Sequence, residues 1–313
     1  MALAAGLGLG AMGCGGSSTD VATTTTAATT TTVATTTTLA KATGSVELGD
    51  VDRPARLVAP ETVTAPAPLL VLLHGYTSNA EFADQYLAVT QQAASRGLYV
   101  LLASGTKDAL GRQFWDATAA CCNSLGAPVD DVGYLGGLID AALAARPIDP
   151  TRVYVLGHSN GGFMAYRLAC ERADQIAAVA VLAGSDAASA GDCAPSRPVS
   201  VLHLHGTADD IVPYAGGRIP AALGDFSGSF PGAVEVITRW AARNGCDPQA
   251  VVGEPLDLDA GVAGAETVVS IYEGCAGGVD VQLDTITAGG HLPALAPDRV
   301  GVDVLDWLVA QGG

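Results

Sequence analysis

The chain has 313 residues, 49% of them hydrophobic, which is enough to bury a large core. Its formal charge of −17 argues against binding to nucleic acid or to anionic membrane surfaces, because like charges repel. No internal apolar run approaches the roughly 20 residues that cross a bilayer. We therefore expect a soluble body.

The first 44 residues differ in composition from the rest of the chain. Residues 1–13 are small and apolar and end before Cys14, a pattern similar to a lipoprotein signal peptide, although the usual positive start is absent. Residues 14–44 are rich in Thr without apolar periodicity, which predicts a disordered linker. We expect export, with Cys14 as a candidate lipid anchor on a secreted or envelope-anchored protein. The folded domain is expected to span residues 45–313.

The cysteines are consistent with export. If Cys14 is set aside, six remain, and an even number suggests disulfides formed in an oxidising compartment. Six cysteines can pair in many ways, so spacing alone fixes no pair. Buried free thiols in a cytosolic protein are the alternative.

From residue 45 onward, apolar strands alternate with helices, which is typical of an α/β domain with a mainly parallel sheet. Strands are expected at 69–73, 98–103, 152–156, 177–182, 199–204, 268–272 and 281–286. Helices are expected at 80–95, 130–145, 231–243 and 300–309, with Pro231 in the first turn of the third. We find no internal repeat and no second domain.

Residues 157–161, Gly-His-Ser-Asn-Gly, match the G-x-S-x-G pattern of a nucleophile elbow. This chemistry needs a serine on a sharp turn between a strand and a helix, and glycines on either side avoid clashes there. A predicted strand leads into the motif and a predicted helix leads out, which favours Ser159 as a nucleophile over an ordinary glycine-rich turn.

A serine hydroxyl needs a base to remove its proton. His291 follows the last predicted strand in a glycine loop, where such a base is delivered, so we predict it as the base. His203 and His205 lie two apart on one strand and are an alternative metal pair, but no third ligand is spaced nearby. We therefore expect no metal.

The acid that orients the base should lie between the nucleophile and the base in sequence. Asp209 fits, with Asp210 as the fallback because spacing does not separate adjacent carboxylates. The order Ser159, Asp209, His291 is that of the α/β-hydrolase fold. We expect this fold, with a mainly parallel central sheet, helices on both faces and no large lid, since residues 184–198 are too short to build one.

The predicted oxyanion hole consists of two backbone N–H groups, one from Asn160 after the nucleophile and one from Tyr76 in the loop that follows residues 69–73. Trp115 and Tyr214 are predicted to contact substrate as flat apolar surfaces, with core packing as the alternative for Trp115.

Several segments around these residues form a specific combination. They are His74-Gly75-Tyr76, Trp115 with Cys121-Cys122, residues 129–134, the elbow with residues 164–170, and residues 205–209 with 212–214. From about residue 45 to the end, the chain resembles the esterase family that contains polyhydroxybutyrate depolymerases, feruloyl and acetylxylan esterases and LpqC-like lipoprotein esterases. The family's histidine loop commonly continues Thr-Trp-Pro-Gly, whereas here His291 is followed by Leu-Pro-Ala.

The resemblance implies a secreted serine ester hydrolase that works through an acyl-enzyme without metal or organic cofactor. It also implies a Cys246–Cys275 disulfide and a link between the Cys121-Cys122 region and Cys170 or Cys193. We expect a monomer acting on a polymeric ester, either polyester or feruloylated or acetylated polysaccharide. An acyltransferase of the same fold, a serine peptidase and a non-catalytic envelope adhesin are the alternatives.

Overall fold

The centre of the molecule is a ten-stranded sheet. The computed structural model describes residues 38–39, 44–64, 66–224 and 226–312, so the predicted signal peptide, Cys14 and most of the predicted linker lie outside the described residues. From edge to edge the sheet contains β14 (Val251–Val252), β15 (Thr267–Tyr272), β16 (Val281–Ile286), β11 (Ser200–Gly206), β10 (Ala178–Leu182), β9 (Ile148–His158), β5 (Ala67–Leu73), β6 (Tyr99–Ala103), β3 (Pro54–Val58) and β2 (Ser45–Gly49).

The six central strands, from β16 to β6, are parallel, and antiparallel strands extend both edges of the sheet. All seven predicted strands are present within this sheet. Three two-stranded ribbons pair β1 (Thr38–Leu39) with β4 (Val63–Thr64), β7 (Thr106–Lys107) with β8 (Gln113–Phe114), and β12 (Gly216–Gly217) with β13 (Phe230–Pro231).

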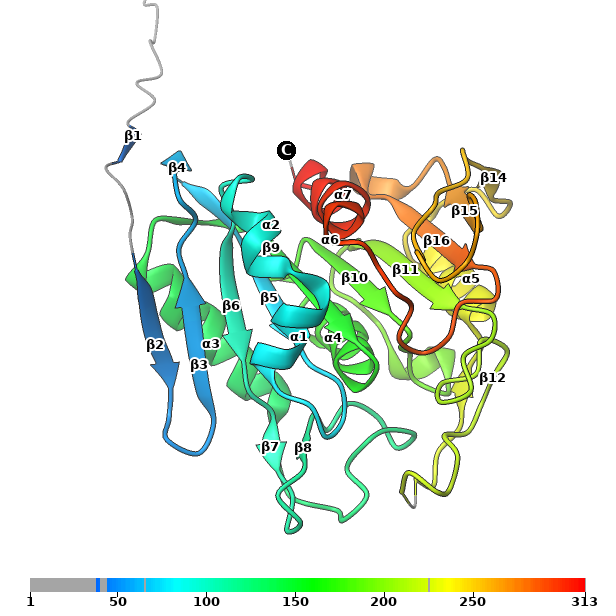
Figure 1. Cartoon of the computed structure of the whole chain (residues 1–313), viewed down its shortest axis with the longest axis horizontal. Coiled ribbons are helices and arrows are strands. Elements are labelled where there is room, and N and C mark those ends of the chain that lie inside the picture. The colour runs from blue at the N-terminus through cyan, green and yellow to red at the C-terminus, as the bar shows by residue number, and fades with distance from the viewer. Residues whose placement is uncertain (1–37, 40–43, 65, 225, 313) are drawn as a thin grey trace, which may run out of the picture. The chain divides into compact units, whose positions relative to one another are not determined.

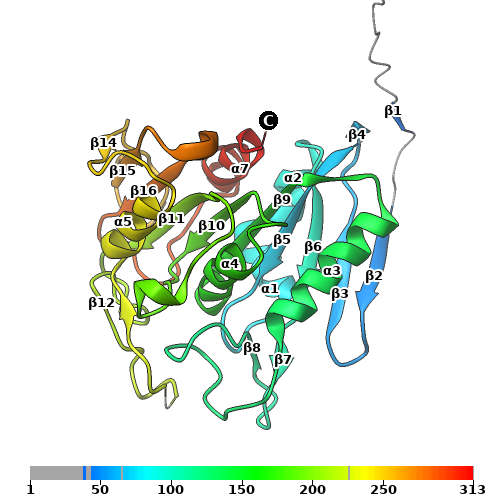
Figure 2. The same cartoon turned by 180° about the vertical axis from the view of Figure 1, so that it is seen from behind.

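Helices cover both faces of the sheet, as predicted. Figure 1 shows one face, covered by α1 (Ala80–Leu87), α2 (Val89–Ala94), α6 (Pro297–Arg299) and α7 (Asp306–Ala310), with the π-helical turn η3 (Val300–Leu305) between the last two. Figure 2 shows the other face, covered by α3 (Asp131–Ala145), α4 (Asn160–Glu171) and α5 (Ala233–Arg243). Two single turns, η1 (Ala190–Asp192) and η2 (Ala276–Gly278), complete the helical elements.

Alternate residues of β5 supply two separate hydrophobic cores. Leu69, Val71 and Leu73 pack in the core beneath α3, α4 and α5, whereas Leu70 and Leu72 pack in the core beneath α1, α2 and the C-terminal helices. Successive side chains of a strand point to opposite faces, so a strand buried on both sides becomes a continuous apolar run.

Two predicted helices differ from their expected bounds. The predicted helix 80–95 is broken at Ala88, which has a φ of 50°. The Asp84 carboxylate accepts hydrogen bonds from both the N–H and the hydroxyl of Thr90. These bonds hold the first turn of α2, so α2 begins as a separate helix. Pro231 lies in β13 rather than in the first turn of α5, which follows Gly232.

Parallel strands deliver their carboxyl ends to one edge of a sheet. The ribbon of β7 and β8, at the bottom of Figure 1, follows the carboxyl end of β6 and marks this edge. No helix among the described residues is long and apolar enough to cross a membrane.

Candidate active site

The turn between β9 and α4 is a strained elbow with Ser159 at its apex. Ser159 has φ 55° and ψ −120°, and its N–H donates to the Leu182 carbonyl at 2.9 Å. A Cβ at Gly161 would overlap the Leu73 carbonyl, and one at Gly157 would overlap the Gly161 carbonyl. The glycines on either side are therefore required for the close approach that projects the serine from the sheet edge.

The structure brings together three side chains that are far apart in sequence. With a neutral imidazole, the Ser159 hydroxyl donates to His291 Nε2 at 2.9 Å, and His291 Nδ1–H donates to Asp209 Oδ2 at 2.8 Å. Asp209 lies in the turn after β11, and His291 lies in the loop after β16. These strands are close neighbours of β9 in the sheet, so their carboxyl ends converge.

Asp209, and not the adjacent Asp210, is the carboxylate beside His291. Asp209 is buried and Asp210 is exposed. Asp209 Oδ1 accepts the backbone N–H groups of Ile211 and Val212 at 2.9 and 2.8 Å. Burial by itself would raise the pKa of Asp209, but hydrogen bonds from His205 and His291 outweigh it and hold the pKa well below its usual range. Asp209 is therefore an anion that can orient an imidazole and stabilise its charged form.

The backbone N–H groups of Tyr76 and Asn160 are the predicted donors of the oxyanion hole. Asn160 begins α4, and Gly75, directly before Tyr76, lies against Ser159, since a Cβ at Gly75 would be 3.3 Å from the serine Cβ. Neither N–H donates to another group among the described residues. Free N–H groups at a helix N-terminus favour an anion.

His74 fixes the peptide that carries the Tyr76 N–H, a role that the sequence analysis missed. The Gly105 N–H donates to His74 Nε2 at 2.9 Å, so the imidazole hydrogen is on Nδ1, which donates to the Gly75 carbonyl at 2.8 Å. The carbonyl of a trans peptide points opposite to the following N–H. Burial lowers the pKa of His74 to about 4, so it stays neutral at pH 7.

Comparison with known proteins agrees with this arrangement. Residues 55–237 match the family model described as esterase PHB depolymerase. The chain belongs to this family. This is the family that the sequence resemblance indicated.

Curated relatives of this esterase include feruloyl esterase B of Piromyces equi, 32% identical over 228 residues, and the putative esterase NocK of Nocardia uniformis subsp. tsuyamanensis, 27% identical over 229 residues. Each match covers 72% of this chain, but only 39% and 64% of the respective relatives.

Solved structures confirm the predicted α/β-hydrolase fold. The acetyl xylan esterase from Aspergillus awamori has a TM-score of 0.58 at 15% identity, covering 85% of this chain and 99% of that one. Est1E from Butyrivibrio proteoclasticus has a TM-score of 0.51 at 16% identity, covering 85% and 98%.

Two predicted substrate contacts of the esterase do not line its cleft. Trp115 is fully buried and its indole N–H donates to the His74 carbonyl at 3.0 Å, so the prediction that it contacts substrate is wrong. Its backbone N–H and carbonyl both bond to the Asn160 side chain, which makes it a support of the elbow. Tyr214 bonds to the Thr285 hydroxyl at 2.8 Å and lines a separate groove along α5.

The loop that carries His291 is held by two side chains from other segments of the chain. His158, inside the elbow, donates from Nε2 to the His291 carbonyl at 3.1 Å, and the Tyr86 hydroxyl of α1 donates to the Pro293 carbonyl at 2.9 Å. Burial and the neighbouring His291 lower the pKa of His158 to about 4. Sequence position alone gives no indication of either contact.

An open cleft of about 380 Å³ runs along the reactive groups. Phe82 of α1 and Leu292 beside the base line it and are 51% and 54% exposed. The other lining residues are Gly75, Tyr76, Thr77, Ser78, Asn79, His158, Ser159 and His291. The cleft therefore offers exposed apolar side chains near a polar reactive centre.

Three disulfides join cysteines within the described part of the chain. Cys246 is joined to Cys275, the pair that the resemblance implied. The implied link from the Cys121-Cys122 region to Cys170 or Cys193 is wrong, because Cys121 is bonded to Cys122 and Cys170 to Cys193. The Cys170 Cα is 5.2 Å from the Cys193 Cα, within the range that one disulfide spans.

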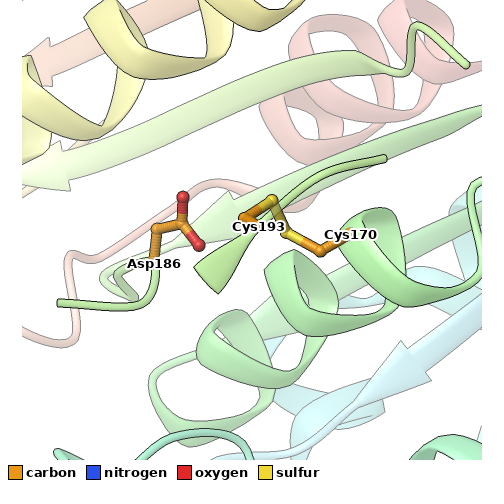
Figure 3. A group of neighbouring side chains, drawn as sticks. All are labelled: Cys170, Asp186 and Cys193. Atoms are coloured by element: carbon orange, nitrogen blue, oxygen red, sulfur yellow. A yellow bond between two sulfur atoms is a disulfide. The ribbon is translucent and has the colours of Figure 1, made fainter. Parts of the chain in front are cut away.

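Two groups of side chains have the residue types of metal ligands, and in both the candidate atoms bond to other protein atoms. Among the described residues, Cys170, Asp186 and Cys193 form one group with suitable atoms within 4.8 Å, but Figure 3 shows the two sulfurs bonded to each other beside Asp186. Asp186 pairs instead with Arg243 at 2.8 Å. His203 Nε2 and His205 Nδ1 face each other at 3.0 Å, so these nitrogens hydrogen bond to one another.

Proposed function

We propose that Ser159 is the nucleophile, His291 the general base and Asp209 the acid that orients the base. The observation that carries this proposal is the continuous pair of hydrogen bonds, 2.9 Å from Ser159 to His291 and 2.8 Å from His291 to Asp209. The reactive hydroxyl also borders an open cleft that a substrate can enter.

The reaction runs through an acyl-enzyme. Ser159 Oγ attacks the ester carbonyl carbon while His291 Nε2 takes the hydroxyl proton, and collapse of the tetrahedral intermediate expels the alcohol, which receives that proton. Water then attacks the acyl-enzyme with the same base, releasing the acid and restoring the serine. Asp209 stabilises the imidazolium that forms in each half-reaction.

The backbone N–H groups of Tyr76 and Asn160 form the proposed oxyanion hole. A carbonyl carbon bonded to Ser159 places its oxygen between the loop after β5 and the start of α4. Each such donor contributes about 3–4 kcal/mol of transition-state stabilisation.

The proposed substrate is a polymeric ester, either a polyester of the polyhydroxyalkanoate or aromatic type, or a feruloylated or acetylated polysaccharide. The open cleft supports this choice because it has room for a chain to enter and leave. Exposed Phe82 and Leu292 in the cleft favour substrates with apolar groups near the ester. The relatives whose names include feruloyl esterase and acetylxylan esterase support the same class.

We also propose that the esterase acts outside the cytoplasm. Its three disulfides support this location, because disulfides persist mainly in oxidising compartments. The proposed lipid anchor at Cys14 would hold it at the envelope.

Hydrolysis of p-nitrophenyl butyrate, methyl ferulate and polyester film by the wild type and Ser159→Ala tests the proposal. We expect the substitution to abolish release of product from every substrate that the wild type cleaves. An acyltransferase would instead transfer the acyl group preferentially to an added alcohol. Activity that survives in Ser159→Ala would remove Ser159 from the mechanism.

A further inference from the structure

A row of three buried side chains leads from α4 to Asp209. The Tyr166 hydroxyl of α4 is 2.7 Å from His203 Nδ1, and His203 Nε2 is 3.0 Å from His205 Nδ1. His205 Nε2 is 2.7 Å from the Val212 carbonyl and 3.3 Å from Asp209 Oδ2. The row therefore connects the helix that follows the nucleophile to the turn that carries the acid.

The hydrogens along this row have one consistent direction. The Val212 carbonyl only accepts, so His205 Nε2 carries the hydrogen and, in the neutral ring, its Nδ1 accepts. His203 must then donate from Nε2 and accept at Nδ1 from the Tyr166 hydroxyl. Each polar atom of the row has a partner of the opposite kind.

The surroundings keep the row dry and favour a neutral His203. Tyr166, His203 and His205 are all almost fully buried. Tyr166 stacks on Trp240 with ring centroids 5.8 Å apart, and Tyr214 meets His205 edge-on at 5.6 Å. Burial, followed by the neighbouring His205, holds the pKa of His203 well below its usual range.

Asp209 Oδ2 thus lies between two imidazoles. His291 approaches at 2.8 Å from the cleft, and His205 approaches at 3.3 Å from the interior. The same His205 N–H also bonds to the Val212 carbonyl, while the Val212 N–H bonds to Asp209 Oδ1. A carboxylate held from several directions cannot rotate away from His291 without losing buried hydrogen bonds.

We propose that His205 is a positioning residue of ester hydrolysis, a proposal that rests on the triad assigned above. Its Nε2–H group holds the acid turn through Asp209 and Val212, and His203 and Tyr166 keep the hydrogen on that nitrogen. The row acts through Asp209 and does not touch the substrate.

Two matched substitutions test the donor at Nε2. The amide nitrogen of Gln reaches the place of Nε2, whereas that of Asn reaches only the place of Nδ1. We expect His205→Asn to lower kcat about 10- to 100-fold, as misplacement of a catalytic group does, with KM within about twofold. His205→Gln should recover kcat to within about threefold of the wild type, since it restores the donor.

Tyr154→Phe is the control for loss of a buried hydrogen bond, because the Tyr154 hydroxyl donates to the Gln311 carbonyl at 2.6 Å, within the other core. It should lower the unfolding temperature and leave kcat unchanged. A kcat of His205→Asn within twofold of the wild type would overturn the proposal, as would a Gln variant no better than the Asn variant when both are folded.

Nitrogen NMR of the wild type tests the same proposal without a substitution. With ¹⁵N-labelled histidine at pH 7, His203 and His205 should both carry a hydrogen on Nε2, and neither should carry one on Nδ1. A hydrogen on Nδ1 of His205 would overturn the proposal. The loss of activity expected for Ser159→Ala does not depend on these results. The His205 proposal can therefore fail while the triad proposal holds.

Discussion

Single hydrogen atoms decide what each histidine of the site can do. His74 carries its hydrogen on Nδ1 because Gly105 donates to Nε2, and this directs the Gly75 carbonyl away from the reacting atoms. His158 donates from Nε2 to the backbone of the base loop. Three histidines outside the proposed triad (His74, His158 and His205) thus hold its backbone or its acid in place.

The adjacent aspartates Asp209 and Asp210 provide a matched pair for the acid. Asp209→Asn should lower kcat by roughly 10⁴-fold, because an amide facing His291 Nδ1 favours the wrong tautomer. Asp210→Asn should leave kcat within about twofold, since its side chain is exposed. Steady-state hydrolysis of p-nitrophenyl butyrate measures both, and equal losses in the two variants would contradict the choice of Asp209.

The residues of the proposed triad could be selected from the sequence, but the side chains that support them could not. A serine between glycines, a carboxylate after a strand and a histidine in a terminal loop follow a known order along the chain. The sequence could not show that Trp115 supports the elbow. Its burial depends on contacts with His74 and Asn160, which are more than 40 positions away in sequence. The His-Gly pair after β5 is the signal that could have identified His74.

Among the secondary-structure elements, the elbow between β9 and α4 depends most on exact fit. The chain leaves the sheet beside Leu73, and the following helix begins so close that no side chain fits at Gly161. The same crossing places the N-terminus of α4 beneath Ser159, where its free N–H groups are needed.

Gly161→Ala should therefore disrupt the esterase, whereas Gly137→Ala should not. A Cβ at Gly161 would overlap the Leu73 carbonyl, and the displaced turn should lower kcat/KM by about 100-fold or more. Gly137 is exposed in α3 with nothing within 4 Å of an added Cβ. Its substitution should keep full activity and raise stability by about 0.5–1 kcal/mol. Kinetics and thermal unfolding of both variants would show whether the elbow is as constrained as the structure indicates.

Long apolar strands were predictable, and short or irregular elements were not. Residues 69–73 are buried on both faces, so they stand out as an apolar run. The hairpin of β2 and β3 was missed because its exposed positions interrupt that pattern. The break at Ala88 depends on the Asp84 side chain and leaves no trace in helical periodicity.

Across the whole molecule, the sheet both separates two cores and gathers the site at one edge. The convergence of the site followed from the parallel strands, but the strand order and the Cys170–Cys193 disulfide depend on tertiary contacts. One carboxylate, Asp284 on β16, is fully buried within this framework, and its Oδ2 has no hydrogen-bond partner among the described residues.

Asp284 should make the folded esterase less stable as pH rises. Burial, together with the charge of Asp303, raises the pKa of Asp284 to about 7, above the usual 3.8. Between these values the unfolded chain has lost the proton and the folded protein has not, so stability falls from about pH 4 to pH 7 and then levels. The stability of Asp284→Asn relative to the wild type should therefore increase over this range, by a few kcal/mol.

Denaturant unfolding of Asp284→Asn and the wild type at a series of pH values measures this difference in stability. A difference that stayed constant from pH 4 to pH 7 would contradict the raised pKa of Asp284.

The central claim is that Ser159 is activated by His291 and Asp209. The most direct measurement is labelling with a fluorophosphonate, followed by mass spectrometry of the peptides. We predict one adduct, on Ser159. The labelling rate should be high for the wild type and Asp210→Asn and far lower for Asp209→Asn. An adduct on another residue, or none from an enzyme that still hydrolyses esters, would contradict the claim.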